Sequence, residues 1–128
     1  MSTRSLIGIR TAKGYKHIYC HYDGSPEHHL PILEKCYSDP AKAEELISLG
    51  DLSVLAEEIG EKHDFDKGID KQPNWCLYYG RDCEEENVDT RLTKTIKEAY
   101  KRQDDVEYIY VLEGIEWKCY TPDDIKNM

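Results

Sequence analysis

The stretch SLIGIRTAKGYKHIYCHY, residues 5–22, decides the fold because it predicts two strands and the turn between them. Residues 5–10 and 15–22 are rich in β-branched and aromatic side chains, and TAKG between them supplies a four-residue loop that ends in glycine. The N-terminal segment is therefore predicted to be a β-hairpin. Because side chains alternate between the faces of a strand, three residues of the second strand are expected on one face: His17, Tyr19 and His21.

Helix signals follow this hairpin. Residues 25–27 (SPE) are typical of a helix start, but Pro31 is tolerated only within a first turn, so the regular helix is expected at about residues 29–37. A second helix is predicted within residues 39–50, between an Asp-Pro start and a glycine stop. A short third helix is expected within residues 51–60, because four apolar residues there have helical spacing: Leu52, Leu55, Ala56 and Ile59.

The second half of the chain predicts one more helix and three strands. Residues 61–74 lose all periodicity and are expected to form a long loop, and WCLYY at 75–79 is predicted to be a strand. A helix is expected to begin at Asp89 or Thr90, with an apolar stripe formed by Leu92, Ile96, Ala99 and Tyr100. Two strands and a frayed polar tail are predicted after it: 106–112, 116–120 and 121–128.

This order of elements favours an α+β fold. Two hairpins and a central strand predict an antiparallel sheet of about five strands, with three to four helices packed mainly on one face. A chain of 128 residues fits a single domain, which is expected to cover residues 1–120. The apolar runs are shorter than the roughly 18 residues that span a bilayer, and MSTRSLIGIR has no signal-peptide core, so a cytoplasmic location is expected.

The formal net charge of −9 is unevenly distributed along the chain. Residues 39–90 hold 5 basic and 15 acidic side chains, a balance of −10, whereas residues 1–38 carry +2 and residues 91–128 carry −1. Such a balance argues against direct contact with nucleic acid or anionic lipid. The central stretch instead predicts a surface that docks on a basic protein, through acidic residues of the long loop and of the later glutamate run: Asp64, Asp66, Glu84, Glu85 and Glu86.

A small-ligand pocket is the first alternative. Tyrosine has an apolar ring and a polar hydroxyl, and Arg81 is the one basic group beside the aromatic strand at 75–79, so the two types together suit a small anionic ligand such as a nucleotide. The residues that this alternative assigns to the pocket are Tyr19, His21, Tyr79, Arg81, Tyr108 and Tyr110.

A small Cys/His enzyme or metal protein is the further alternative, built on a cluster in residues 17–29: Cys20, His21, His28 and His29. No CxxC pair, nucleophile elbow, phosphate-binding loop or HExxH motif accompanies the cluster. A calcium loop starting at Asp64 also fails, because Ile69 and Trp75 stand where that loop needs glycine and glutamate. We therefore expect no catalytic residue, no bound metal and no cofactor.

Four strings together carry a resemblance: MSTRSLIGI, IYCHYDGSPE, LISLGDLSVL and YYGRD. They resemble a family of small proteins common in bacteriophage and prophage genomes, whose members begin MSTRSxIG and continue with YCHxDGxP and a YGRD-like element. The resemblance implies a phage- or prophage-encoded protein acting in the bacterial cytoplasm. The expectation is a non-enzymatic acidic binding protein that antagonises a host defence or nucleic-acid-processing complex by stoichiometric binding.

Overall fold

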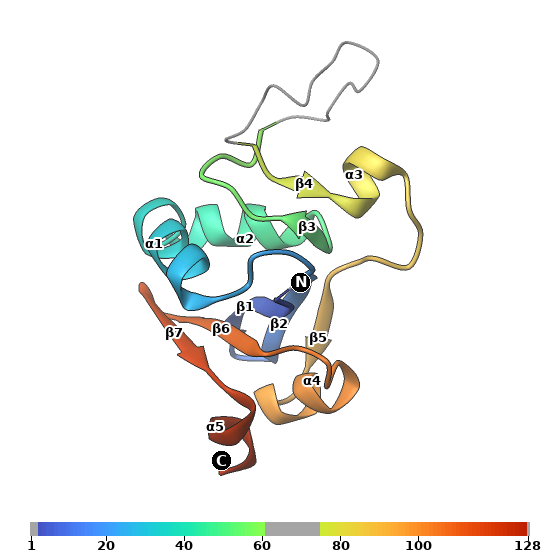
Figure 1. Cartoon of the computed structure of the whole chain (residues 1–128). Coiled ribbons are helices and arrows are strands. Elements are labelled where there is room, and N and C mark those ends of the chain that lie inside the picture. Colours follow the sequence, from blue (N-terminus) through green and yellow to red (C-terminus); the bar gives the residue numbers. More distant parts are fainter. Residues whose placement is uncertain (1–2, 61–74, 128) are drawn as a thin grey trace.

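The computed structural model describes residues 3–60 and 75–127, which form one mixed sheet and five short helices (Figure 1). The strands are β1 (Ser5–Thr11), β2 (Gly14–Cys20), β3 (Leu52–Val54), β4 (Leu77–Tyr78), β5 (Arg91–Thr93), β6 (Tyr108–Glu113) and β7 (Glu116–Tyr120). The helices are α1 (Pro26–Cys36), α2 (Pro40–Ser48), α3 (Tyr79–Cys83), α4 (Ile96–Arg102) and α5 (Pro122–Lys126). The predicted loop at 61–74 lies outside the described residues.

The sheet has seven strands and both kinds of pairing, so the predicted antiparallel sheet of about five strands is wrong. Its order is β4-β3-β2-β1-β6-β7, with β5 paired to β2 beside this path. The two predicted hairpins, β1–β2 and β6–β7, are antiparallel, but β1 runs parallel to β6, and β2 runs parallel to β3. The parallel β1–β6 pair joins the two hairpins at the centre of the sheet.

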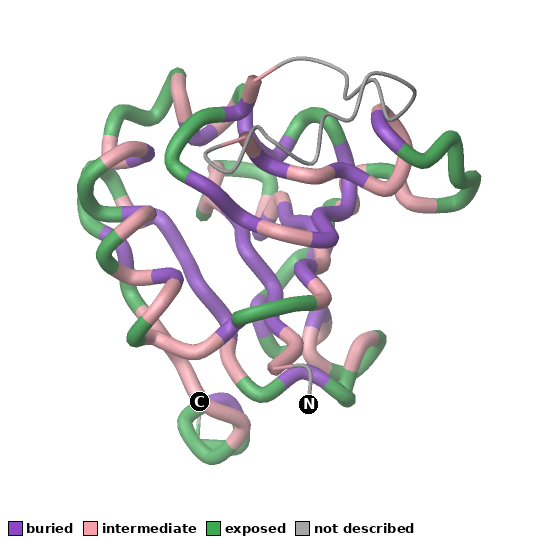
Figure 2. The backbone as a smooth tube through the Cα atoms, turned by 45° about the horizontal axis from the view of Figure 1, so that its top comes forward, coloured by how far each residue is buried: buried purple, intermediate pink, exposed green. Residues whose placement is uncertain are grey.

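Helices cover both faces of the sheet, which corrects the prediction that they pack mainly on one face. In Figure 1, α1 and α2 lie above the central strands, and α4 and α5 lie below them. Alternating residues of β1 and β6 divide between two cores: Ile7 and Tyr110 pack under α1 and α2, whereas Leu6 and Ile109 pack against α4 and α5. Figure 2 shows the buried residues concentrated along the strands between these layers.

One predicted helix is wrong and another begins later than predicted, because the neighbouring β2 backbone pairs with the segments concerned. Within 51–60, β3 replaces the expected third helix, and the backbone N–H groups of His21 and Tyr22 donate to Leu52 O and Ser53 O, each at 3.1 Å. Residues 91–93 pair with β2 as β5, and α4 begins only at Ile96. A helix of two turns is marginal alone, so strand pairing prevails over the helical spacing.

The ends of two other elements also differ from expectation. Helix α1 begins at Pro26 and contains Pro31, rather than starting near residue 29. The carbonyl that loses its partner to Pro31 belongs to Glu27, which is exposed to solvent. Residues 122–126, expected to fray, form α5, because Thr121 and Asp124 make a capping box and Ile125 is buried.

Gly8 is required where β1 crosses a stacked aromatic pair. It lies opposite His17, whose ring stacks on Tyr15 with centroids 4.7 Å apart and planes 11° apart. A Cβ at Gly8 would lie 2.3 Å from Lys16 O and 2.6 Å from Tyr15 Cε1.

Gly8→Ala is therefore expected to lower the free energy of unfolding by about 1–3 kcal/mol through overpacking. Urea denaturation measures the change. Gly80→Ala is the matched control, because its nearest neighbour across the added Cβ is 3.4 Å away, on Val88, and alanine favours the helix there. Equal stability of the Gly8→Ala variant and the unmodified protein would contradict the close packing of β1 on β2.

Candidate functional site

A group of partly exposed rings lies at the end of β2. The Tyr19 hydroxyl is 2.7 Å from His21 Nδ1, and the His21 and Tyr22 rings meet edge to face with centroids 4.6 Å apart and planes 87° apart. Tyr22 is 44% exposed, which is high for a large aromatic residue held in such a contact. These rings present aromatic surface to solvent in a fixed arrangement.

Tyr79 joins this group from the other side of β3. It begins α3, although the sequence predicted a strand to this point. Burial raises the pKa of Tyr79, a hydrogen bond with Ser53 lowers it, and the nearby Tyr22 and Glu85 raise it. Burial also raises the pKa of Tyr19 to about 12, with Tyr79 among the groups that act on it. The structure thus brings together three of the residues proposed for a ligand pocket, Tyr19, His21 and Tyr79, and adds Tyr22.

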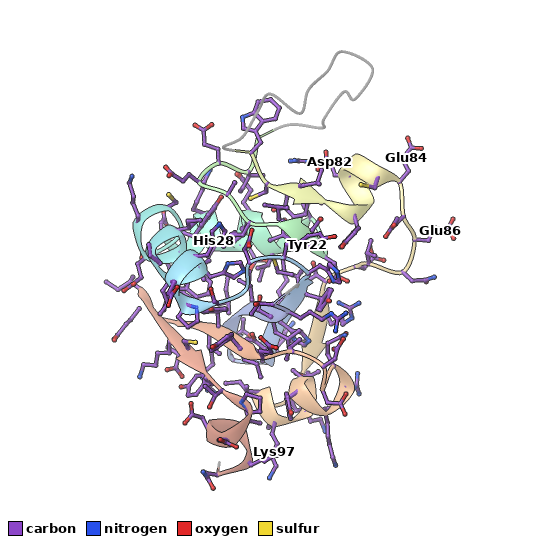
Figure 3. All side chains as sticks on the ribbon, in the orientation of Figure 1. Tyr22, His28, Asp82, Glu84, Glu86 and Lys97 are labelled. Atoms are coloured by element: carbon purple, nitrogen blue, oxygen red, sulfur yellow. The ribbon has the colours of Figure 1, made fainter. Side chains whose placement is uncertain are left out.

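The glutamate run continues directly from this aromatic group. Glu84 ends α3 in the left-handed conformation, at φ 57°, and the Glu85 backbone N–H donates to Tyr79 O at 3.0 Å. Glu84, Glu85 and Glu86 are exposed; Figure 3 shows Glu84 and Glu86 on the segment after α3, above and to the right of Tyr22. We call Tyr19, His21, Tyr22, Tyr79 and Glu84–Glu86 the aromatic–acidic surface. Asp64 and Asp66, predicted for the same acidic surface, lie outside the described residues.

A buried ion pair that the sequence did not predict holds the backbone of this surface. Asp51 is 4% exposed, and its carboxylate accepts from Arg91 Nη1 at 2.8 Å and Nη2 at 3.1 Å. The same carboxylate accepts the backbone N–H of Tyr19 at 2.9 Å. The hydrogen bonds that Arg91 donates to Asp51 raise the pKa of Arg91. The pair therefore fixes both β5 and the aromatic end of β2.

Arg81, the predicted cation of the ligand pocket, is used inside the protein. Its guanidinium has five N–H donors. Nε and Nη2 donate to the two Asp82 carboxylate oxygens at 3.0 and 3.1 Å. The three other donors go to backbone carbonyls: Ile59 O at 2.9 Å, Gly60 O at 3.2 Å and Cys76 O at 2.9 Å. All five donors therefore have partners within the chain, and Arg81 secures α3 rather than facing the rings.

The last two residues of the predicted pocket lie on the other face of the sheet. Tyr108 and Tyr110 pack in the core under α1, and the buried Tyr110 hydroxyl donates to Gly24 O at 2.5 Å. A cavity of about 330 Å³ lies elsewhere, lined by Arg10, Thr95, Ile96 and Lys97, and contains none of the predicted residues. The six residues are thus divided among three places.

The Cys/His cluster is divided as well. Cys20 is fully buried, and burial raises the pKa of its thiol far above the usual range, so the reactive thiolate is disfavoured. His28 and His29 meet each other, with their Nδ1 atoms 3.0 Å apart, whereas His21 contacts Tyr19. Within residues 3–60 and 75–127, no three His, Cys, Asp or Glu side chains are grouped so as to hold a metal ion.

The sequence signals for the missed residues were weak. Tyr22 ends a predicted strand, Asp51 begins the segment expected to form the short third helix, and Arg91 follows the expected start of the last helix. In the described part of the chain, the helices lack the length and apolar character needed to cross a membrane.

The chain matches no protein-family model, no curated protein and no solved structure.

Proposed function

We propose that this chain is a non-enzymatic binding protein that docks its aromatic–acidic surface on a basic surface of a protein partner. The observation that carries the proposal is that the exposed glutamate run follows Tyr79 in the chain, with the Glu85 backbone N–H on Tyr79 O, while Tyr79 neighbours the partly exposed rings at the end of β2. Tyrosine is enriched at the centres of protein interfaces, where one end of the side chain is apolar and the other bonds. Charges around such a centre select the partner and speed association.

The setting of this function comes from the sequence resemblance. It supports a phage- or prophage-encoded protein in the bacterial cytoplasm, where the partner belongs to a host defence or nucleic-acid-processing complex. Such complexes carry basic surfaces for nucleic-acid backbones, and an acidic protein occupies them by charge complementarity. Binding by this route blocks the complex stoichiometrically and requires no catalytic residue.

No specific observation favours the nucleotide-binding alternative. Its arginine donates all five N–H groups to Asp82 and to backbone carbonyls. Its six residues also occupy separate places on the two faces of the sheet and in α3. No specific observation favours the enzymatic alternative either, because the Cys20 thiol is buried and burial raises its pKa.

Neutralising the glutamate run is expected to weaken partner binding by about tenfold at low salt and to flatten its salt dependence. The variant is the triple Glu84→Gln, Glu85→Gln, Glu86→Gln. Affinity capture from the bacterial host identifies the partner, and titration calorimetry with the purified partner then gives the dissociation constant at several salt concentrations.

The matched control removes three charges elsewhere, at the exposed residues Glu34, Glu116 and Asp123. It is expected to change the dissociation constant by less than about twofold, because distant exposed charges are screened. Tyr22→Ala tests the aromatic centre separately and is expected to weaken binding with the salt dependence unchanged. Equal losses in the two triple variants, or binding that ignores salt, would count against docking at this surface.

A further inference from the structure

His29 is a buried imidazole with one unsatisfied nitrogen. It lies on α1 with 0% exposure and packs against the Tyr110 ring, with centroids 5.3 Å apart. Its Nδ1 is 3.0 Å from His28 Nδ1, so one of these nitrogens donates and the other accepts. Its Nε2 is buried and has no hydrogen-bond partner among the described residues. A site with this geometry accepts a neutral imidazole and has no acceptor for a second N–H.

The same Tyr110 holds the segment that leads from the aromatic–acidic surface into α1. Its hydroxyl donates to Gly24 O, and the Gly24 N–H donates to Thr3 O at 2.8 Å. Gly24 is two residues after Tyr22, and Ser25 O accepts the His29 backbone N–H at 3.0 Å. The position of Tyr22 is therefore linked to the packing of His29 through Tyr110 and the first turn of α1.

Among the residues that the structure describes, no group around His29 compensates a positive charge. Burial and the neighbouring His28 lower the pKa of His29 to about 3. Burial raises the pKa of Tyr110, and of the thiols Cys119 and Cys20 that act on it, so all three are neutral at pH 5–7. The carboxylates of α1 and of the segment before it are exposed to solvent: Asp23, Glu27 and Glu34. Protonation therefore leaves a buried, unpaired charge, which is strongly unfavourable.

We propose that His29 is an acid-sensitive switch for the aromatic–acidic surface: when it is protonated, its ring leaves Tyr110 and the segment from Tyr22 to Ser25 loosens. The segment carries Tyr22 out of its contact with His21, and partner binding weakens. Only this last step rests on the proposed function; the loosening itself is a property of the isolated protein.

Hydrogen exchange of the full chain at pH 7 and pH 5 tests the switch, after correction for the intrinsic exchange rate at each pH. The local opening that exposes His29 should become roughly 25-fold more favourable at pH 5, because the opened imidazole titrates near 6.5. Amides at Gly24 and in residues 28–30 and 32–33 are expected to lose that much protection, whereas those of β1 and β6 keep theirs. Unchanged protection at Gly24 would overturn the proposal.

His29→Phe is the decisive variant, because phenylalanine retains an aromatic contact with Tyr110 and does not titrate. It is expected to show the same protection at both pH values, and His28→Asn, in which His29 still titrates, is expected to lose protection at pH 5. An equal loss in His29→Phe would overturn the proposal. Should that variant fold poorly, an NMR titration of the His29 ring in the unmodified protein replaces it. The ring is expected to gain its proton at the same pH at which the Gly24 amide loses its protection from exchange. A ring that titrates near pH 6.5 while the protection of Gly24 is unchanged refutes the switch.

The two proposals fail differently. If the glutamate variant weakens partner binding but Gly24 protection is independent of pH, the switch is refuted and the docking surface stands. If protection falls at pH 5 as expected but the glutamate variant binds the partner normally, the docking surface is refuted and the acid-sensitive opening stands. If both hold, the partner dissociation constant rises at the pH at which the opened form becomes a sizeable fraction of the protein, and His29→Phe removes most of that rise.

Discussion

Replacing Arg81 with alanine is expected to lower the free energy of unfolding by about 3–5 kcal/mol, because it takes the guanidinium away from a buried carboxylate and from three backbone carbonyls. The Asp82 side chain is 0% exposed and also accepts the Tyr78 backbone N–H at 2.7 Å. Arg81 lies over the Tyr78 ring, with Cζ 4.8 Å from the centroid, and donates to three backbone carbonyls. The alanine variant loses every contact of the guanidinium at once, while Asp82 keeps the Tyr78 N–H.

Urea denaturation followed by circular dichroism gives the change in stability. Arg81→Lys is expected to recover only part of it, since one ammonium group cannot reproduce five donors in a planar array. Arg102→Ala is the matched control, because that arginine pairs with Glu98 on the surface and is 65% exposed; such pairs contribute about 1 kcal/mol or less. A loss at Arg81 no larger than that at Arg102 would contradict the internal role of Arg81.

The role of Arg81 also explains why it looked like a ligand residue in the sequence. Asp82 is its neighbour in the sequence, but three of the acceptors of Arg81 are carbonyls of residues 59, 60 and 76, and a carbonyl acceptor leaves no sequence pattern. A basic residue beside tyrosines is compatible with a pocket and with a structural contact. The folded geometry decides between them, because a guanidinium whose five donors are occupied has none left for an anion.

Local patterns predicted the hairpins, whereas the order of the sheet depended on distant pairing. The β1–β2 and β6–β7 pairs were predicted because alternating strands and their turns lie within a few residues of each other. The parallel β1–β6 pair joins segments about a hundred residues apart, such as Ser5 and Tyr108, and no short-range pattern encodes it. That pair also leaves both faces of β1 and β6 to be covered, and hence places helices on both sides.

The segment at 51–60 shows how burial confuses sequence periodicity. Leu52, Leu55 and Ile59 are all buried, as a helical face would be, yet the first of them lies in β3. An apolar run of this length is ambiguous between a buried strand and a short helix. Pairing to the end of β2 decides the outcome, and it places Asp51 against the Tyr19 backbone. The candidate site therefore depends on an element that the sequence misassigned.

Replacing Arg91 with alanine is expected to lower the free energy of unfolding by about 2–3 kcal/mol and to release β5 from β2. The Asp51 carboxylate, 6% exposed at the side chain, then retains the Tyr19 N–H but loses its cation. The Arg91 side chain is 36% exposed, so part of the ion pair is solvated and the loss is smaller than at Arg81. Hydrogen exchange at Leu92 and Thr93 is expected to rise first, because β5 pairs with β2 over only three residues.

The double variant Asp51→Asn, Arg91→Ala separates the ion pair from simple loss of packing. Asparagine keeps an acceptor for the Tyr19 N–H and removes the uncompensated charge, so the double variant is expected to be about 1 kcal/mol more stable than Arg91→Ala alone. If urea denaturation gives a loss in the double variant equal to the sum of the losses in Asp51→Asn and Arg91→Ala, Arg91 acts through packing only. The same comparison also tests the link to function. If the Asp51 side chain fixes Tyr19 through its backbone N–H, the double variant keeps Tyr19 in place and binds the partner more tightly than Arg91→Ala does.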